Sequence, residues 1–510
     1  MRHYSIWVLV SLVFVSSATT TSAEAANAAQ GDTLRRLNVM LLTADDLHCQ
    51  SVGAFEGRTP DLTPNLDRLA SEGMRFFRAH VNAAICQPSR GVLGTGRYGH
   101  NSGIMGFMHT DRDIPTIMET LRGAGYLTGI LGKVGHSTPK ADYQWDFAHD
   151  QNELGAGRDP QIYYQYCQEF LQGCRKENKP FYFMVNSHDP HRPYHIPGKP
   201  IKGAVEPSRT YQPEEVPVPG FVPDLPGVRE ELSYYLNSVR RCDDTFGKVL
   251  QALEESGFAS DTVVMFLSDN GIAIPFAKCN AYLASTRTPW IVRWPGVVKP
   301  GSVDREHFIS GVDFFPTVLD ALHLPTEDGL DGTSFLPLLR GEPQAGRDKV
   351  FAQIDRKAGG DAVPMRCVQD AEFGYIFNAW SDGAHVYHNN NEGMTMKAMN
   401  EAAKTDPFIA SRVQVFRYRT PEELYDLKAD PDCLKNLIDQ PEYRGQADRL
   451  RSELLAWMRR TGDPLASAFE NREKPEQVKQ VLEQVYGKPA TKARRVRKGE
   501  QQDRIQRRNR

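Results

Sequence analysis

Charged and polar side chains suited to catalysis or metal binding follow four short apolar runs of the sequence. Each run has the composition of a strand that is buried on both faces. Because parallel strands end at the same edge of a sheet, and ligands bind beyond that edge, we expect the four groups to lie together. In chain order the groups are Asp45 and Asp46; Lys133 and His136; His188, Asp189 and His191; and Asp269 and Asn270.

Two of these groups, the first and the last, consist entirely of oxygen donors. Asp45, Asp46 and Asp269 offer carboxylates, and Asn270 offers an amide carbonyl. Calcium and magnesium prefer such ligands, whereas zinc prefers nitrogen and sulfur. Helix capping is the alternative for each pair taken alone, since Asp and Asn are favoured where helices begin. Together the two pairs predict a site for a hard cation, calcium or magnesium.

Residues 86–97 form an unusual segment, which reads Cys-Gln-Pro-Ser-Arg-Gly-Val-Leu-Gly-Thr-Gly-Arg. This segment resembles the formylglycine signature of the type I sulfatases, which belong to the alkaline phosphatase superfamily. In that family a formylglycine-generating enzyme of the export pathway oxidises the cysteine to an aldehyde. A buried thiol or half of a disulfide is the alternative for an isolated cysteine. The resemblance implies that Cys86 becomes formylglycine.

The resemblance to sulfatases extends over most of the chain. The element at 132–136 has one residue more between Lys133 and His136 than the family's Gly-Lys-x-His pattern, a spacing that also occurs in the family. The other matching segments are Ala44-Asp45-Asp46-Leu47, His188-Asp189-Pro190-His191-Arg192-Pro193, Leu267-Ser268-Asp269-Asn270-Gly271 and Glu423-Leu424-Tyr425-Asp426-Leu427.

Some details resemble one branch of the family, the heparan N-sulfatases (N-sulfoglucosamine sulfohydrolases). That branch commonly carries Arg where this chain has Lys278. N-linked and O-linked sulfate therefore both stay open as substrates. The matching segments are Asp189-Pro190-His191-Arg192, Asp269-Asn270-Gly271-Ile272 and Met365-Arg366-Cys367-Val368-Gln369.

The resemblance also implies a role for each site residue. One hydroxyl of the hydrated aldehyde attacks sulfur, and loss of a proton from the other expels sulfate and restores the aldehyde. The roles are calcium binding for Asp45, Asp46, Asp269, Asn270 and the modified Cys86; charge compensation for Arg90; contact with the diol for Lys133 and His136, with His136 the general base; and contact with the sulfate and the leaving atom for His191 and Lys278, with His191 the proton donor.

These expectations predict a hydrolase that removes sulfate, as a sulfuric ester or a sulfamate, from a sulfated carbohydrate. A phosphonate or phosphodiester hydrolase of the same superfamily is one alternative. A non-catalytic glycan-binding protein, with Cys86 unconverted, is another. The exact substrate, exo or endo action and the oligomeric state stay open.

Alternation of strands and helices predicts an α/β fold over residues 35–340. We expect a large, mostly parallel sheet flanked by helices, as in alkaline phosphatase, with one long helix over 233–256. A Gly- and Pro-rich segment at 340–346 predicts a linker. A smaller α+β domain with an antiparallel sheet is expected at 348–465.

Bulk composition and the two ends of the chain predict its compartment. The 510 residues carry a formal net charge of −3, which gives no electrostatic case for nucleic acid. Residues 1–25 have the pattern of a signal peptide, with an apolar stretch shorter than the ~20 residues that span a bilayer. We expect an exported protein with no membrane span, in a periplasmic, extracellular or lumenal compartment. The basic tail 488–510 is expected to be disordered, with polysaccharide binding as the alternative, and the pairing of the eight cysteines stays open.

Overall fold

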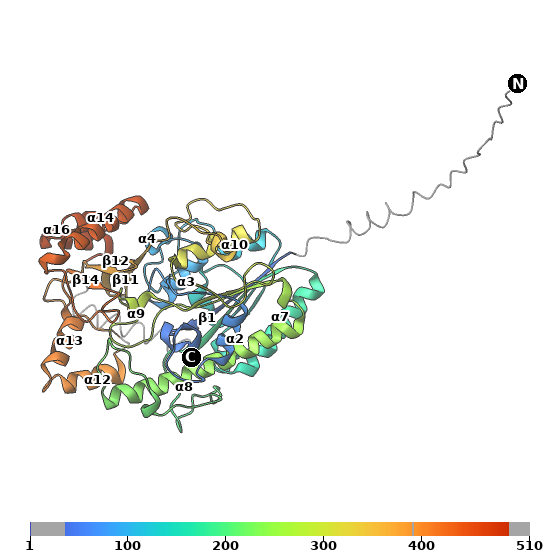
Figure 1. Ribbon diagram of the computed structural model, residues 1–510, viewed down its shortest axis with the longest axis horizontal. Coiled ribbons are helices and arrows are strands. Elements are labelled where there is room, and N and C mark those ends of the chain that lie inside the picture. Colours follow the sequence, from blue (N-terminus) through green and yellow to red (C-terminus); the bar gives the residue numbers. More distant parts are fainter. Residues whose placement is uncertain (2–35, 390–391, 489–510) are drawn as a thin grey trace.

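The structure is a computed structural model that describes Met1, residues 36–389 and residues 392–488 (Figure 1). The predicted signal peptide, apart from Met1, and all but the first residue of the predicted basic tail lie outside the described residues. In the part that is described, no helix is both long and apolar enough to cross a membrane. All eight cysteines lie in that part, and none is joined in a disulfide.

An eight-stranded sheet forms the centre of the larger part, in the order β5-β4-β6-β1-β7-β8-β2-β9. The four strands predicted to carry the site are neighbours and parallel, as expected. The sheet turns antiparallel at β8, which pairs with β7 and β2 in that sense. The strands are β1 (Asn38–Asp45), β2 (Met74–Phe76), β4 (Leu127–Leu131), β5 (Phe147–His149), β6 (Phe181–Pro190), β7 (Thr262–Ser268), β8 (Trp290–Arg293) and β9 (Ser302–Asp304).

Helices cover both faces of this sheet, so its central strands are fully buried. Figure 1 shows α2, α7 and α8 below the sheet and α3 and α10 above it. The long helix α8 begins at Pro226, earlier than the predicted 233, because Pro226 suits a first helical turn. The main helices are α2 (Pro64–Glu72), α3 (Cys86–Thr95), α5 (Ile117–Gly123), α7 (Pro160–Glu177), α8 (Pro226–Ser256) and α10 (Phe314–Ala321).

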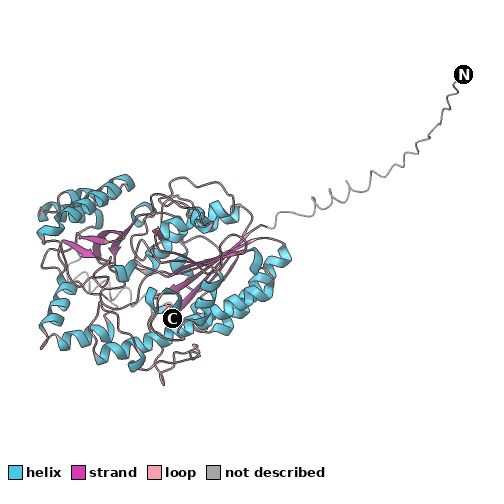
Figure 2. Ribbon diagram, in the orientation of Figure 1, coloured by secondary structure: helices cyan, strands magenta, loops and turns pink. Residues whose placement is uncertain are grey.

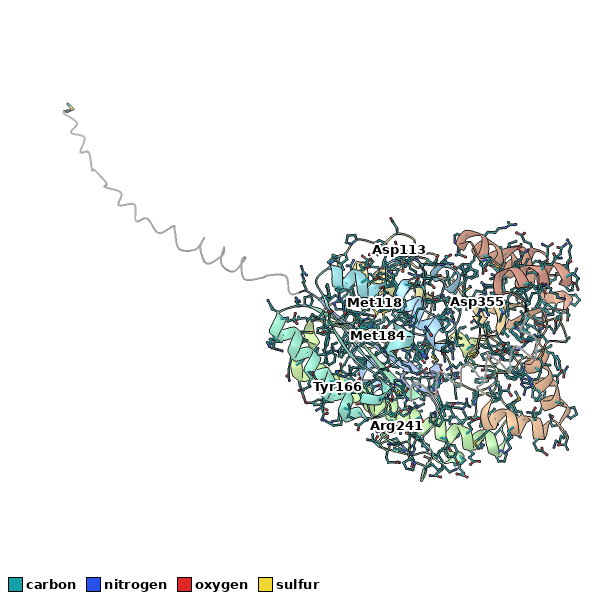
Figure 3. All side chains as sticks on the ribbon, turned by 180° about the vertical axis from the view of Figure 1, so that it is seen from behind. Asp113, Met118, Tyr166, Met184, Arg241 and Asp355 are labelled. Carbon is teal, nitrogen blue, oxygen red and sulfur yellow. The ribbon has the colours of Figure 1, made fainter. Side chains whose placement is uncertain are left out.

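Shorter elements connect these layers. Side chains fill the space between sheet and helices throughout (Figure 3). The short helices are α4 (Gly99–Ser102), α6 (Val134–Ser137), α9 (Leu283–Thr286) and α11 (Leu336–Leu339), and β3 (Ala79–His80) pairs with β10 (Ile309–Ser310).

A second, four-stranded antiparallel sheet lies apart from the first (Figure 2), as predicted. Its strands run in the order β11-β12-β13-β14. Two further helices follow the predicted end of this region at 465. The elements are β11 (Lys349–Arg356), β12 (Ala362–Asp370), β13 (Phe373–Asn378), α12 (Gly393–Ala402), α13 (Pro407–Tyr418), β14 (Glu422–Asp426), α14 (Arg444–Thr461), α15 (Ala466–Glu470) and α16 (Pro475–Tyr486).

Candidate active site

The carboxyl ends of β1 and β7 bring the two predicted metal pairs together. The strands are parallel, and Ala44 pairs with Ser268. The residues that follow therefore meet: the backbone N–H of Asp46 donates to Asp269 Oδ1, with 3.1 Å between N and O. Asp46 has a φ of 71°, in the left-handed region that side chains rarely adopt. Such backbone strain clusters at functional sites, because only a well-supported structure maintains it.

Cys86 is the first residue of α3, a helix that is buried along its whole length. Two glycines of the 86–97 segment allow this helix to pack closely. A Cβ on Gly91 would lie 2.9 Å from the side chain of Ile104, and one on Gly94 would lie 2.7 Å from that of Pro139. Because α3 begins at Cys86, the positive end of its dipole lies at this residue, where it favours negative charge.

The side chain of Cys86 lies among three predicted site residues. Its Sγ is 3.2 Å from Asp45 Oδ1 and 3.0 Å from Lys278 Nζ. Lys278 Nζ also donates to Asp46 Oδ1 at 2.5 Å, and Asn270 Nδ2 donates to the same oxygen at 2.7 Å. Segments that are far apart in the sequence thus form one cluster.

Arg90 is fully buried one turn after Cys86. Its Nε and Nη2 atoms lie 3.0 Å and 2.7 Å from Asp269 Oδ2. Its Nη1 donates to Thr43 Oγ1 at 2.7 Å and to Asn186 Oδ1 at 2.6 Å. Arg90 therefore fixes the position of a predicted calcium ligand, a contact that the sequence did not predict.

The end of β4 contributes Lys133 and His136. Lys133 has a φ of 52° and forms an ion pair with Asp45 Oδ2. His136 lies in α6, and its Nδ1 is buried with no hydrogen-bond partner among the described residues. Burial, followed by the charge of Lys133, lowers the pKa of His136 to about 4. The imidazole is therefore neutral at neutral pH and able to accept a proton.

His191 presents one ring nitrogen to the cluster. Its Nδ1 lies 2.6 Å from the carbonyl oxygen of Arg192, so Nδ1 must carry the proton of that hydrogen bond. Its Nε2 lies 3.9 Å from Asp46 Oδ2, and the side chain is 35% exposed. His191 is thus positioned to exchange a proton with a substrate at Nε2.

Asp189 and His188, which precede His191 in the chain, are both buried. Asp189 is fully buried, and its carboxylate accepts from Arg241 Nε at 2.6 Å and from Arg158 Nε at 3.1 Å. Arg158 Nη2 also donates to the carbonyl oxygen of His191 at 2.9 Å. His188 is buried, and its Nδ1 has no hydrogen-bond partner among the described residues. Asp189 therefore supports the backbone of His191 through Arg158. It is not part of the oxygen cluster, which consists of Asp45, Asp46, Asp269 and Asn270.

This support predicts a large effect on stability. Arg241→Gln should lower the free energy of unfolding by about 3 kcal/mol, because it removes one of two cations from a buried carboxylate. Urea unfolding measures the loss. Arg240→Gln is the matched control on the same helix, and its partly exposed pairs with Asp61 and Asp244 should contribute only about 1 kcal/mol or less. Equal losses in the two variants would contradict the supporting role of Asp189.

The cluster balances three carboxylates against three cations. Burial would raise the pKa of Asp45, but Lys133 and the other neighbouring cations hold it well below its ordinary value. Burial and repulsion from Asp45 raise the pKa of Asp269 to about 7. Burial and the same Asp45 charge raise the pKa of the Cys86 thiol well above its ordinary value, so the unmodified thiol is a weak nucleophile. The charged members are Asp45, Asp46, Asp269, Arg90, Lys133 and Lys278.

The oxygen atoms fit a hard divalent cation. One oxygen from each of Asp45, Asp46 and Asp269 lies within 4.8 Å of the others. Asp46 Oδ2 and Asn270 Oδ1 are buried and accept no hydrogen bond from any described residue. Buried polar atoms normally have a partner, and calcium takes carboxylate and amide oxygens as ligands. A bound cation would also favour the charged form of Asp269.

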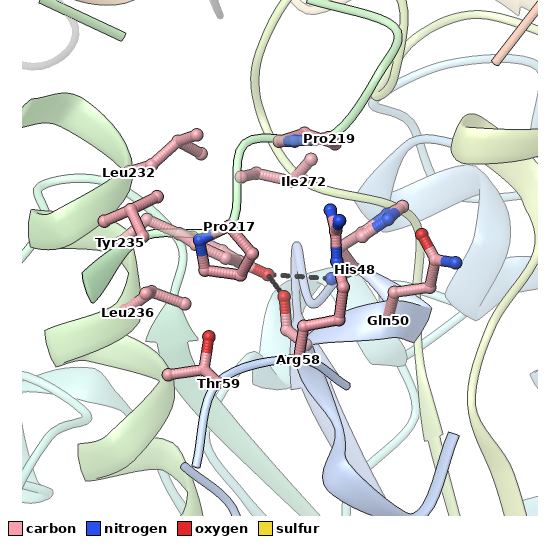
Figure 4. Close-up of a pocket in the computed structure, with 12 residues that line it drawn as sticks. His48, Gln50, Arg58, Thr59, Pro217, Pro219, Leu232, Tyr235, Leu236 and Ile272 are labelled. Carbon is pink, nitrogen blue, oxygen red and sulfur yellow. Dashed lines mark hydrogen bonds between the residues drawn. The ribbon is translucent and has the colours of Figure 1, made fainter. Parts of the chain in front are cut away.

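A small cavity lies beside His48, two residues after Asp46. Its volume is about 40 Å³, and its lining includes Thr59, Tyr235 and Ile272 (Figure 4). Tyr235 Oη accepts a hydrogen bond from the backbone N–H of His48 at 2.9 Å. None of the predicted catalytic or metal-binding residues lines this cavity. A space of this size holds only about one or two water molecules, so it is not the substrate site.

Comparison with known proteins places this geometry in a family. The family model described as Sulfatase matches residues 37–324. This chain belongs to the sulfatase family. A second family model, described as N-sulphoglucosamine sulphohydrolase, C-terminal, matches residues 274–412 of this sulfatase. The predicted enzyme class and family are therefore confirmed.

Individual relatives agree with this assignment. The N-sulphoglucosamine sulphohydrolase of Homo sapiens is 31% identical over 484 residues, which cover 85% of this sulfatase and 92% of the human protein. An ulvan-active sulfatase of Formosa agariphila is 26% identical, with 84% and 81% covered.

Solved structures confirm the predicted fold. A protein in complex with its substrate D-glucosamine-2-N,6-O-disulfate aligns with a TM-score of 0.63 at 20% identity, covering 84% of this sulfatase and 98% of that chain. The phosphonate monoester hydrolase of Agrobacterium radiobacter aligns with a TM-score of 0.61 at 19% identity, covering 84% and 96%. The same fold thus occurs in a protein with a sulfated sugar as its substrate and in a phosphonate monoester hydrolase.

Several residues of this sulfatase support the site without having been predicted. Thr43 and Asn186 bind Arg90, and Arg158 and Arg241 bind Asp189. Thr43 and Asn186 each stand at the carboxyl end of an apolar run, the runs that predicted β1 and β6. A polar residue at that position was the signal in the sequence that could have marked them. Nothing in the sequence marked either arginine, because each lies far along the chain from its partner.

Proposed function

We propose that this sulfatase removes sulfate from N-sulfated glucosamine residues of a sulfated carbohydrate, using a formylglycine formed from Cys86 and a bound calcium ion. One observation carries the proposal: residue 86 lies in contact with Asp45 on one side and with the Lys278 ammonium on the other. A group transferred at this position would meet both the cation site and a buried positive charge.

Asp45, Asp46, Asp269 and Asn270 would hold the calcium ion together with residue 86. When present, calcium supplies positive charge to the sulfate oxygens, and hydrated formylglycine supplies the hydroxyl nucleophile and a second hydroxyl for releasing sulfate. Arg90 holds Asp269 in place through Nε and Nη2. Lys133 and Lys278 form ion pairs with Asp45 and Asp46 and supply positive charge for binding an anionic substrate.

The preference for N-linked sulfate is supported by the region that the second family model matches. Lys278 and the loop after β13 both lie within that match. Asn389 Nδ2 donates to the carbonyl oxygen of Lys278 at 3.1 Å, and Tyr387 Oη donates to that of Cys279 at 2.9 Å. This loop therefore fixes the backbone that carries Lys278, the proposed sulfate-binding lysine. The human relative that is 31% identical to this chain is an N-sulphoglucosamine sulphohydrolase.

Two histidines move protons on opposite sides of the reaction. His191, protonated at Nε2, donates to the departing nitrogen, because an amine leaves readily only as a neutral molecule. His136 is neutral and has a buried Nδ1 without a partner among the described residues, so it accepts the proton whose loss releases sulfate.

The leaving group tests the role of His191. His191→Gln should lower kcat for N-sulfoglucosamine by about 10²- to 10⁴-fold, the usual contribution of general acid catalysis. The loss should be much smaller with 4-nitrophenyl sulfate, since 4-nitrophenolate leaves without a proton. Steady-state rates on the two substrates give the comparison. His307→Gln is the control, because His307 pairs with Asp304 outside the cluster. Equal losses on both substrates would exclude proton donation by His191.

Matched substrates test the proposal as a whole. Sulfate release from N-sulfoglucosamine, glucosamine 6-sulfate and the corresponding disulfate is compared with hydrolysis of a phosphodiester and a phosphonate monoester. We expect the highest kcat/KM on N-sulfoglucosamine. A higher kcat/KM on glucosamine 6-sulfate would overturn the proposed preference for N-linked sulfate. A preference for the phosphodiester or the phosphonate would overturn the proposed sulfatase activity. Binding of heparan fragments without turnover, and with Cys86 unmodified, would indicate a glycan-binding protein.

Maturation and export complete the proposal. A formylglycine-generating enzyme would recognise the 86–97 segment during export and oxidise Cys86, and the signal peptide 1–25 would direct the chain out of the cytoplasm. Peptide mass spectrometry of protein from its native host tests both points. Conversion of Cys86 and an N-terminus beyond residue 25 are expected.

A further inference from the structure

A short apolar segment, residues 105–109, lies beside the active site and is not used by the reaction described above. Its two central side chains are exposed: Phe107 is 40% exposed and Met108 is 39% exposed. Among the described residues, no other pair of consecutive large apolar side chains is exposed. Exposure of this kind is unfavourable in water and often marks a binding surface.

The segment is attached directly to the catalytic helix. Gln87, the residue after Cys86, is buried and donates from Nε2 to the carbonyl oxygen of Met108 at 2.9 Å. The Phe107 ring packs edge-on against the imidazole of His136, with 5.3 Å between the ring centroids and 77° between the planes. Phe107 thus packs against the proposed base, in a segment that is hydrogen-bonded to the nucleophile-bearing helix.

The residues before and after Phe107 are held in place by contacts with other segments. The carbonyl oxygen of Met105 accepts a hydrogen bond from the backbone N–H of Arg356 at 3.1 Å. A Cβ on Gly106 would lie 3.1 Å from the Arg356 side chain, so the two segments pack closely. His109 Nδ1 lies 2.9 Å from the carbonyl oxygen of Thr138. A ring held in this way loses little conformational freedom when a ligand binds it.

The site residues described so far are charged or polar. Asp45, Asp46 and Lys278 and the proposed calcium ion act on sulfate and the nucleophile. A pyranose ring also has an apolar face made of C–H groups, which packs well on an aromatic ring. Ligand sites generally combine a few polar groups with such apolar and aromatic walls.

We propose that Phe107 is a substrate-positioning residue whose ring stacks against the pyranose that bears the sulfate being removed. This inference rests on the proposed function, because it takes the substrate to be a sulfated sugar. The stacked ring would orient the sulfate toward residue 86 and the leaving nitrogen toward His191. It would also favour sugars that present an unsubstituted C–H face on that side.

Substitutions at Phe107 separate stacking from support of His136. Phe107→Ala should raise KM for monomeric N-sulfoglucosamine about fivefold, within the range of one aromatic contact, and leave kcat within about twofold. Phe107→Leu, which still packs on His136 but has no aromatic face, should raise KM similarly. Phe107→Trp should keep KM near the wild-type value. Phe408→Ala is the control, since Phe408 is an exposed phenylalanine of α13 and is 58% exposed.

Inorganic sulfate supplies the second measurement. As a competitive inhibitor it occupies the charged part of the site without a sugar, so its inhibition constant should be unchanged in all the Phe107 variants. If Phe107→Ala lowered kcat and Phe107→Leu restored it, Phe107 would act by supporting His136 and not by stacking on the sugar. A KM effect seen with a disaccharide but not with the monosaccharide would overturn the assignment to the sulfated ring. Failure of the proposed function is recognised separately, because the wild-type protein would then not turn over N-sulfoglucosamine.

Discussion

Cys86→Ala should lower sulfate release by at least about 10⁴-fold, the scale of losing a covalent nucleophile, while the four remaining ligand residues still bind calcium without the ligand from residue 86. The reason lies in the cluster: Cys86 Sγ touches Asp45 and Lys278, yet Asp45 and Asp46 keep their other contacts when Sγ is removed. Sulfate release by ion chromatography measures the activity, and calorimetric titration measures calcium binding. Normal turnover by this variant would refute the nucleophile.

Cys86→Ser is the matched variant that isolates the second hydroxyl. A serine at position 86 has one hydroxyl, so it can accept sulfate but cannot expel it by the elimination expected for hydrated formylglycine. We expect at most one equivalent of amine released per protein, with sulfate retained on residue 86. Mass spectrometry of the intact chain detects the added sulfate. Continuous turnover by Cys86→Ser would show that the second hydroxyl is not needed.

Asp46→Asn should lower calcium affinity by at least about 100-fold, because changes to groups that merely support a ligand already cost about 10- to 100-fold. Asp46 Oδ1 is already bonded to Asn270 and Lys278, so the amide nitrogen that this substitution introduces would replace Oδ2, the oxygen with no hydrogen bond from a described residue. Chelation of wild-type protein with EGTA should remove activity, and added calcium should restore it. Calcium should raise the Tm of the wild-type protein and leave that of Asp46→Asn unchanged.

Asp243→Asn is the control for Asp46→Asn. Asp243 is a buried carboxylate of α8 that accepts hydrogen bonds from Asn65 and Leu66 and lies outside the oxygen cluster. Its replacement should change stability without changing calcium affinity. If both variants lost calcium to the same extent, general destabilisation would explain the result. Calcium binding by Asp46→Asn with wild-type affinity would exclude Asp46 as a ligand.

The sequence by itself predicted that the two pairs of metal-binding residues meet at the site. Asp45 and Asp269 each follow an apolar run, and parallel strands that lie side by side must end at the same edge. The 86–97 segment, singled out by its resemblance to a family signature, forms a helix that starts at Cys86, with glycines at the positions where it packs closely. Strand ends and helix starts can be predicted in this way because they depend on a few neighbouring residues.

Only the tertiary structure decided which charges pair within the site. Arg90 reaches Asp269 instead of lying along its own helix. Asp189 forms an ion pair with Arg241, although in the sequence it stands between His188 and His191. Long side chains can reach several partners, and the choice depends on segments tens to hundreds of residues away that pack against them. The place of Phe107 beside His136 was hidden for the same reason: a phenylalanine in a loop gives no local sign of the surface it will face.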